Sequence, residues 1–273
     1  MVKRGEVRLE DPVSKFLPEA VVVPEKDGRQ ITLLDLATQT SGLPPMPDNF
    51  SPADPTNPFA DYTVVQMYEF LSGYSLTRGV GQQYEYSNFG MGLLGHALAL
   101  VAEEDYETLV RTRICGPLEM GSTAITLSPN LKNRLATGHN PGLKPVPNWD
   151  IPTLAGAGAL RSTVDDMLQF VAANLGLVES KLSPVMQETH ASRHQTGMPD
   201  TEIGLAWHVL KKHGSEIVWH NGGTGGYHSF TGFDRKKRLG VVVLSNASTD
   251  IDDIGRHILE PKLPLARLEP PRI

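Results

Sequence analysis

The sequence lacks several features that would place a protein in a narrow class. It has a single cysteine, Cys115, which excludes a disulfide framework within the chain and leaves the redox compartment open. No apolar run reaches the roughly 20 residues that span a bilayer. Residues 1–20 also lack the basic, apolar and small-residue regions of a signal peptide. We therefore expect no membrane span, and the sequence leaves the cellular compartment undecided.

Positive charge is also scarce, because 25 Lys and Arg residues stand against 31 Asp and Glu residues, for a net charge of −6. Without a basic stripe, nucleic acid is not an expected partner. A His-Glu-x-x-His pattern is absent, and we interpret His190 and His194, four residues apart, as exposed surface histidines. The sequence accordingly predicts neither a metal site nor a cofactor. A Gly-x-Ser-x-Gly nucleophile elbow is absent as well, which argues against an α/β-hydrolase.

The apolar content is sufficient for a sizeable core. Hydrophobic residues make up 40% of the 273 positions, enough for one large domain or two interleaved lobes. Two capping boxes, Thr32–Asp35 and Thr63–Gln66, each predict the start of a helix. The second is followed by a helical apolar face at Val64, Met67, Tyr68 and Leu71.

The middle of the chain is predicted to be helical. We expect helices at Phe89–Val101 and, after a cap at Asp105, at Tyr106–Ile114. Another helix should start from a cap at Ser162 with Asp165 and run to Asn174. The proline-rich residues 43–61 lack an apolar period and are predicted to be surface loop.

After about residue 200 the pattern changes to short β-branched and aromatic runs. The expected strands are Gly204–Leu210, Glu216–His220, Tyr227–Phe233 and Leu239–Leu244. With a glycine-rich turn at 222–226, they predict an antiparallel meander. A last helix at Asp250–Leu259 should cover one face of the sheet with an apolar stripe formed by Ile251, Ile254, Ile258 and Leu259.

Two short segments carry groups suited to acyl-transfer chemistry. Tyr86-Ser87-Asn88 precedes a buried helix and offers a phenol and an amide, although helix starts favour Ser and Asn for structural reasons alone. A tyrosine serves as a general base only if nearby cations lower its pKa from about 10. His220-Asn221-Gly222-Gly223 ends a strand, and its glycines allow backbone N–H groups to approach a ligand or simply form a flexible hairpin.

The chain resembles the class C β-lactamases and the related penicillin-binding serine hydrolases, carboxylesterases and D-alanyl-D-alanine peptidases. The resemblance extends over nearly the whole chain in five ordered blocks. These are Gly5–Val13 with Phe16–Pro18, Ile31–Ala37 with Thr40–Pro44, Tyr86–Asn88, Gly156–Met167, and His220–Gly223.

The resemblance implies an α/β (α+β) fold of the β-lactamase/transpeptidase type. An antiparallel sheet flanked by helices would form one lobe from residues 1–30 and 200–273, and residues 31–199 would form a mainly helical lobe. The cleft between the lobes would be lined by Tyr86, Asn88 and His220. Members of this family are often periplasmic or secreted.

The resemblance also implies roles for individual residues. Tyr86 would be the base that activates the serine and later water, and Asn88 would hold the substrate amide or the family lysine. His220 stands where relatives have lysine or histidine. Asn221 and Gly222 would bind substrate, and the Gly223 N–H would be an oxyanion donor. The substrate would be a small molecule or a peptide with a carbonyl centre.

The family's Ser-x-x-Lys pair has no counterpart in this sequence, since no Ser is followed three residues later by Lys. Ser41 is a poor substitute, because turn serines commonly hydrogen-bond locally. Val2–Gly5 has the pattern of a last helical turn, so we expect the nucleophile helix and the N-terminal strands to be missing, upstream of Met1. The chain would then be truncated and inactive alone, unless an N-terminal segment acts in trans. The alternative is a non-catalytic binding protein that retains the fold.

Two departures from the family pattern bear on chemistry. Gln39 stands where relatives often have histidine, which we expect to alter packing. His220 replaces the more strongly charged lysine, and an imidazole with a pKa near 6.5 is mostly neutral at pH 7. The resemblance therefore favours an ester or amide substrate over efficient β-lactam hydrolysis.

Overall fold

The computed structural model describes residues 1–266 of the chain. Its main sheet has six strands in the order β10-β9-β8-β7-β6-β5, and every neighbouring pair is antiparallel. The strands are β5 (His194–Gln195), β6 (Thr201–Ile203), β7 (His208–Lys212), β8 (Ser215–Thr224), β9 (Tyr227–Asp234) and β10 (Leu239–Ser245). The predicted meander is confirmed.

Two small two-stranded hairpins form separate sheets of their own. They are formed by β1 (Glu25–Lys26) with β2 (Arg29–Gln30), and by β3 (Gly138–His139) with β4 (Pro145–Val146). The α-helices are α1 (Leu33–Ala37), α2 (Val64–Gly73), α3 (Asn88–Ala102), α4 (Tyr106–Val110), α5 (Pro129–Arg134), α6 (Val164–Asn174), α7 (Ser183–Thr189) and α8 (Asp252–Leu259). Short turns of other helix types are η1 (Val2–Arg4), η2 (Val13–Phe16), η3 (Arg111–Cys115), η4 (Gly116–Leu118) and η5 (Ala155–Ala157).

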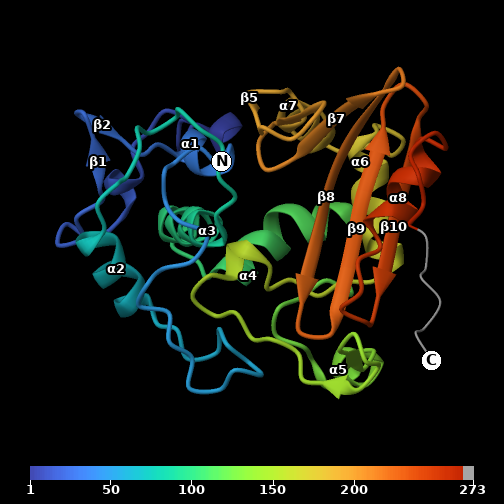
Figure 1. Cartoon of the computed structure of the whole chain (residues 1–273), viewed down its shortest axis with the longest axis horizontal. Helices are drawn as coiled ribbons and strands as arrows, with labels where there is room; N and C mark the ends of the chain where they lie inside the picture. Colours follow the sequence, from blue (N-terminus) through green and yellow to red (C-terminus); the bar gives the residue numbers. More distant parts are fainter. Residues whose placement is uncertain (267–273) are drawn as a thin grey trace.

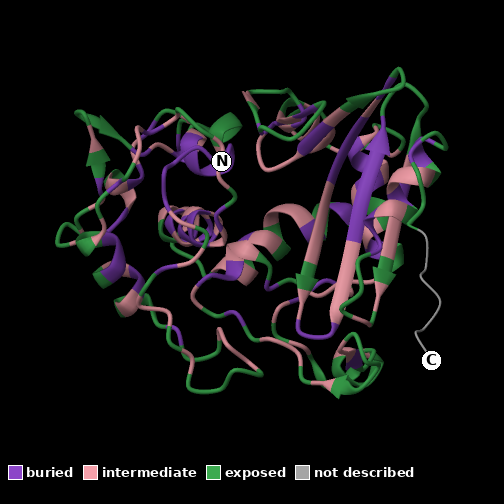
Figure 2. Ribbon diagram, viewed as in Figure 1, coloured by how far each residue is buried: buried purple, intermediate pink, exposed green. Residues whose placement is uncertain are grey.

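The molecule has a mainly helical side and a sheet side (Figure 1). Helices α1, α2 and α3 pack together around one apolar cluster that includes Leu36, Leu71 and Phe89. On the other side, α8 and α6 line the sheet through separate clusters around Phe230 and Phe233. Buried residues accordingly gather in the helices of the first side and along β8 and β9 (Figure 2). None of the helices in residues 1–266 combines the length and apolar character that a bilayer span requires.

Both predicted capping boxes are confirmed. The Thr32 hydroxyl accepts a hydrogen bond from the Asp35 N–H, and the Asp35 carboxylate accepts one from the Thr32 N–H. Thr63 and Gln66 make the same reciprocal pair at the start of α2. Such pairs satisfy N–H groups that have no partner within the helix, which is why both helices begin where the sequence indicates.

The start of α6 differs by one residue from the prediction. Thr163, not Ser162, is the cap, and its hydroxyl accepts a hydrogen bond from the Asp166 N–H. The Ser162 hydroxyl instead lies 2.7 Å from the Thr123 hydroxyl. A tertiary hydrogen bond has therefore replaced the local one that the sequence suggested.

The glycine-rich turn is shorter than predicted. Strand β8 continues through Gly222, Gly223 and Thr224, which pair with Ser229, His228 and Tyr227 of β9. Only Gly225 and Gly226 remain between the two strands, as in a two-residue hairpin, and Gly226 has φ 80°. The prediction of a five-residue turn at 222–226 was wrong, because glycines can also be accommodated in a strand.

Only part of the apolar stripe predicted on the last helix is buried. Leu259 is fully buried and Ile251 nearly so, whereas Ile254 and Ile258 are 40% and 47% exposed. Helix α8 thus covers the sheet with a narrower face than expected.

The N-terminal residues pack against the helical side of the molecule, not against the sheet lobe to which we assigned them. Val7, Val13 and Leu17 belong to the apolar cluster of the helical side, although residues 1–30 were assigned to the sheet lobe. Conversely, α6 lies within the range 31–199 and packs on the sheet through Val171. Residues 267–273 of the predicted sheet lobe lie outside the described part of the chain.

Candidate active site

Tyr86 and Asn88 flank Ser87, whose side chain has a structural role. Ser87 caps α3, where its hydroxyl accepts a hydrogen bond from the Gly90 N–H at 2.8 Å and donates one to the Pro44 carbonyl at 2.6 Å. Ser87 is buried, whereas Tyr86 is 36% exposed and Asn88 is half-buried at the first position of the helix. The cap therefore fixes the backbone between the phenol and the amide.

Gln39 holds residues 85–87 in place through two hydrogen bonds, a role that the sequence did not reveal. Its backbone carbonyl accepts a hydrogen bond from the Glu85 N–H, and its side-chain oxygen accepts one from the Ser87 N–H, each at 2.8 Å. Gln39 is buried and has φ 59°. We predicted only a packing change at this position, because no local pattern shows a contact with residues so distant in the chain.

His220 lies in the middle of β8. Its Nδ1 lies 2.6 Å from the Asn221 carbonyl oxygen, which can only accept, so Nδ1 carries the proton and Nε2 keeps its lone pair. Burial lowers the pKa of His220, opposed by the Asn221 carbonyl and by the charge of Asp252. The neutral imidazole is therefore favoured at pH 7.

The structure brings Tyr86 and His220 together from separate parts of the chain. Their ring centroids are 6.3 Å apart, with planes inclined at 39°. Within residues 1–266, no protein group forms a hydrogen bond with the Tyr86 hydroxyl, the Asn88 side-chain amide or His220 Nε2. Three polar groups of the predicted site thus remain available to a ligand.

The environment of Tyr86 does not favour a phenolate. Burial raises the pKa of the Tyr86 phenol above its ordinary value, whereas a general base requires the opposite shift. The role predicted for Tyr86 would need a nearby cation that lowers this pKa.

The other predicted site residues of β8 are Asn221, Gly222 and Gly223. The Asn221 side chain donates a hydrogen bond to Asp252 Oδ2 at 2.7 Å, so that amide is already engaged with α8. Strand β7 pairs with β8 only as far as Trp219. Residues 220–224, including Gly222 and Gly223, therefore pair with β9 alone among the described strands, and their other backbone edge is open.

A second tyrosine–histidine pair lies behind the first. The Tyr84 hydroxyl is 2.9 Å from His208 Nε2, and the His208 ring is 5.6 Å from that of His220. Burial raises the pKa of Tyr84 to about 12 and lowers that of His208 to about 4. Both groups are therefore neutral at pH 7 and support the His220 strand without adding charge.

Other side chains considered in the sequence have structural roles. The Ser41 hydroxyl accepts a hydrogen bond from the Leu43 N–H at 3.2 Å, in the local turn that was expected. His190 was predicted to be exposed, and this was wrong. It is buried, with Nε2 2.7 Å from Asn174 Oδ1, and burial lowers its pKa to about 4. His194, also predicted to be exposed, lies in β5 and is half-buried.

Comparison with known proteins finds relatives of the family that the sequence motifs indicated. The family model described as Beta-lactamase matches residues 1–259. The D-alanyl-D-alanine-carboxypeptidase/endopeptidase AmpH of Escherichia coli K12 is 32% identical over 264 residues, which cover 91% of this chain and 66% of that protein. A protein named Beta-lactamase from the same organism is 28% identical, covering 90% of this chain and 70% of its own. The chain thus spans about two thirds of the length of these relatives.

Solved structures show the same fold. A β-lactamase/D-alanine carboxypeptidase from Yersinia pestis, complexed with citrate, has a TM-score of 0.81 at 26% identity, covering 95% of this chain and 77% of that one. A class C β-lactamase has a TM-score of 0.79 at 23% identity, covering 98% and 77%. The predicted fold class is confirmed. With a family model that matches nearly its whole length, the chain belongs to the β-lactamase family of serine hydrolases, related to the penicillin-binding proteins.

Proposed function

We propose that residues 1–273 form the substrate-binding part of an acyl-transfer serine hydrolase, and that this chain does not turn over its substrate alone. The observation that carries the proposal is the approach of Tyr86 to His220, at 6.3 Å between ring centroids. The Tyr86 hydroxyl, the Asn88 amide and His220 Nε2 would contact the ligand. The reaction class is hydrolysis of an ester, amide or β-lactam through an acyl-enzyme.

The open edge of β8 suits a ligand with a peptide backbone. An extended peptide can add to residues 220–224 as a further strand, with backbone hydrogen bonds supplying affinity. The Gly223 N–H would lie among the donors for the carbonyl that is attacked. Because His220 is neutral at pH 7, it attracts a substrate carboxylate less than lysine would. We therefore favour an ester or amide substrate over a β-lactam, whose carboxylate a lysine would bind more strongly.

The nucleophile and its lysine are proposed to come from polypeptide outside residues 1–273, joined to this chain or acting in trans. Two observations support this. The sequence has no Ser-x-x-Lys. The pKa of Tyr86 is also raised, whereas a working base would need a nearby cation that lowers it.

Binding tests the first part of the proposal. N-acetyl-D-alanyl-D-alanine would be titrated into the purified chain by calorimetry, with Tyr86→Phe, Asn88→Ala and His220→Ala as variants. Each variant should bind at least about tenfold more weakly, as expected for the loss of one or two hydrogen bonds. Tyr74→Phe and His213→Gln, which change the same residue types elsewhere, should bind like the wild type. Equal binding by all five variants would reject the site.

Covalent labelling tests the second part. A fluorescent penicillin or a fluorophosphonate should leave the chain unlabelled, since only a competent serine forms the adduct. An adduct on residues 1–273 would refute the proposal of inactivity. Extending the chain with the polypeptide encoded in frame upstream should introduce a Ser-x-x-Lys and restore labelling. A short nitrophenyl ester should then be hydrolysed faster than a chromogenic cephalosporin.

The absence of Ser-x-x-Lys also favours a second candidate, a non-catalytic protein that binds such a peptide. The same experiments separate the two. Dipeptide binding together with an upstream sequence that lacks Ser-x-x-Lys would favour the binding protein.

A further inference from the structure

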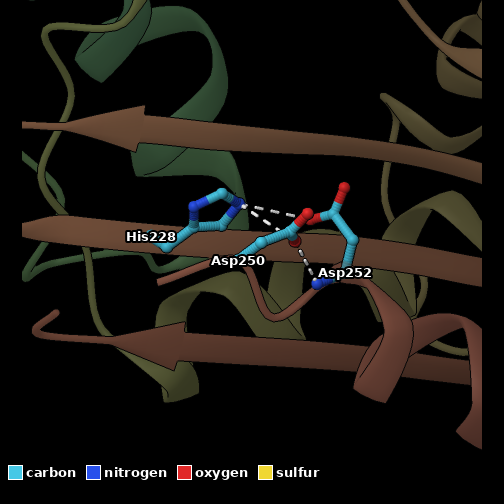
Figure 3. Close-up of side chains that lie close together, drawn as sticks. All are labelled: His228, Asp250 and Asp252. Atoms are coloured by element: carbon cyan, nitrogen blue, oxygen red, sulfur yellow. Dashed lines mark hydrogen bonds and ion pairs between the residues drawn. The ribbon is translucent and has the colours of Figure 1, made fainter. Parts of the chain in front are cut away.

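Three side chains outside the proposed substrate contacts converge at the end of the sheet. His228 lies on β9 opposite Gly223, Asp250 precedes α8, and Asp252 is the first residue of that helix. His228 Nε2 is 3.3 Å from Asp252 Oδ1 and 3.7 Å from Asp250 Oδ1 (Figure 3). The three donor atoms all lie within 4.8 Å of one another.

One oxygen of the buried carboxylate in this cluster is not satisfied by protein groups. The Asp252 side chain is only 5% exposed. Its Oδ1, aimed at His228, has no hydrogen-bond partner within the described residues, and neither does His228 Nε2. A buried charged oxygen without a partner is costly. A positively charged ligand between the imidazole and the two carboxylates would remove that cost.

The other oxygen of Asp252 is held firmly. Oδ2 accepts hydrogen bonds from the Asn221 amide at 2.7 Å and from Arg256 Nη2 at 2.8 Å. Such outer contacts orient a metal-binding carboxylate and leave its free oxygen aimed at the metal. The Arg256 charge offsets one of the two carboxylates, so the cluster with Arg256 keeps a single net negative charge when His228 is neutral. A dication therefore remains electrostatically acceptable.

The two distances from His228 to the carboxylates suit a small tetrahedral ion. Ligand atoms at about 2.0 to 2.1 Å from tetrahedral zinc are about 3.4 Å apart, close to the 3.3 and 3.7 Å from His228 Nε2 to the carboxylates. Asp250 is 74% exposed, so water has access to the fourth position. One imidazole and two carboxylates are a ligand set that zinc accepts.

We propose that His228, Asp250 and Asp252 bind a divalent transition-metal ion of the zinc class. The ion would link β9 to the start of α8. Through Asp252 and Asn221 it would also stabilise the strand segment that carries His220. This inference does not depend on the proposed function, because it concerns binding of the ion alone.

Metal titration tests the proposal. Chelator-treated, desalted protein would be titrated with Zn²⁺ by calorimetry and with Co²⁺ by visible absorption, which reports four-coordinate geometry. One equivalent should bind, and Zn²⁺ should raise the melting temperature. His228→Gln and the exposed Asp250→Asn should each weaken binding at least tenfold. Because Asp250 is exposed, its variant should fold even if the His228 variant does not.

Matched controls exclude binding elsewhere. His213→Gln, in the β7–β8 turn, and Asp27→Asn, in the β1–β2 turn, change exposed residues of the same types and should bind Zn²⁺ like the wild type. The proposal is overturned if neither ion binds saturably. It is also overturned if the His228 and Asp250 variants bind as tightly as the controls, which would mean that the cluster is only an ion pair.

Discussion

Acidification should destabilise this protein through His208, which is buried against Trp219 at 4.9 Å between ring centroids. Burial, with smaller contributions from His220 and Arg256, lowers the pKa of His208 to about 4. In the unfolded chain the value is about 6.5. Between these two pH values the unfolded state binds a proton that the folded state does not, so stability is lost as the pH falls through that window.

The magnitude follows from the two pKa values. Lowering the pH from about 7.5 to about 4.5 should cost roughly 2.5 kcal/mol of unfolding free energy through this one histidine. That is a large fraction of a typical total of about 5 to 15 kcal/mol. His190, whose pKa is also lowered to about 4, adds a similar loss that a change at His208 leaves in place.

The informative variant is the double replacement Tyr84→Phe/His208→Phe. It keeps a ring against Trp219 and removes both partners of the 2.9 Å hydrogen bond, so neither polar group is left unpaired. Urea unfolding would be measured across the same pH range for wild type, double variant and His213→Gln. We expect the double variant to lose about 2.5 kcal/mol less than the other two. An equal loss in all three proteins would refute the assignment.

Two further predictions concern the sheet and α8. Gly255→Ala would place a Cβ 2.1 Å from a ring carbon of the fully buried Phe230, so it should cost about 1 to 3 kcal/mol in urea unfolding. Gly121→Ala, with no atom within 4 Å of the new Cβ, should cost clearly less, and equal costs would contradict the packing. A hydrogen bond from Ser215, aided by an ion pair with a lysine, lowers the pKa of Glu260 to about 2. The stability it contributes is present above its ordinary pKa of about 4.3 and is lost as the pH falls towards 2. In Glu260→Gln the melting temperature should therefore depend less on pH across that range. An unchanged dependence on pH would refute the assignment.

Features that depend on near neighbours in the chain were predictable. The capping boxes at Thr32 and Thr63 place two helices correctly because the cap and its partner are only three residues apart. The sheet followed from short apolar runs and turns, although β8 proved longer because its glycines pair with β9. The family was recognisable from short ordered motifs, since each is a local run of residues.

The three-dimensional site depended on contacts that no local pattern contains. The approach of Tyr86 to His220, the two hydrogen bonds from the 85–87 segment to Gln39, and the meeting of His228 with Asp252 all join segments far apart in the sequence. Local periodicity fixes which face of an element is apolar, and packing of whole elements decides which polar groups then meet. The sequence alone thus determined the fold class and two candidate segments. Only the tertiary structure decided that Asn221 is engaged by α8, while Tyr86, Asn88 and His220 remain available.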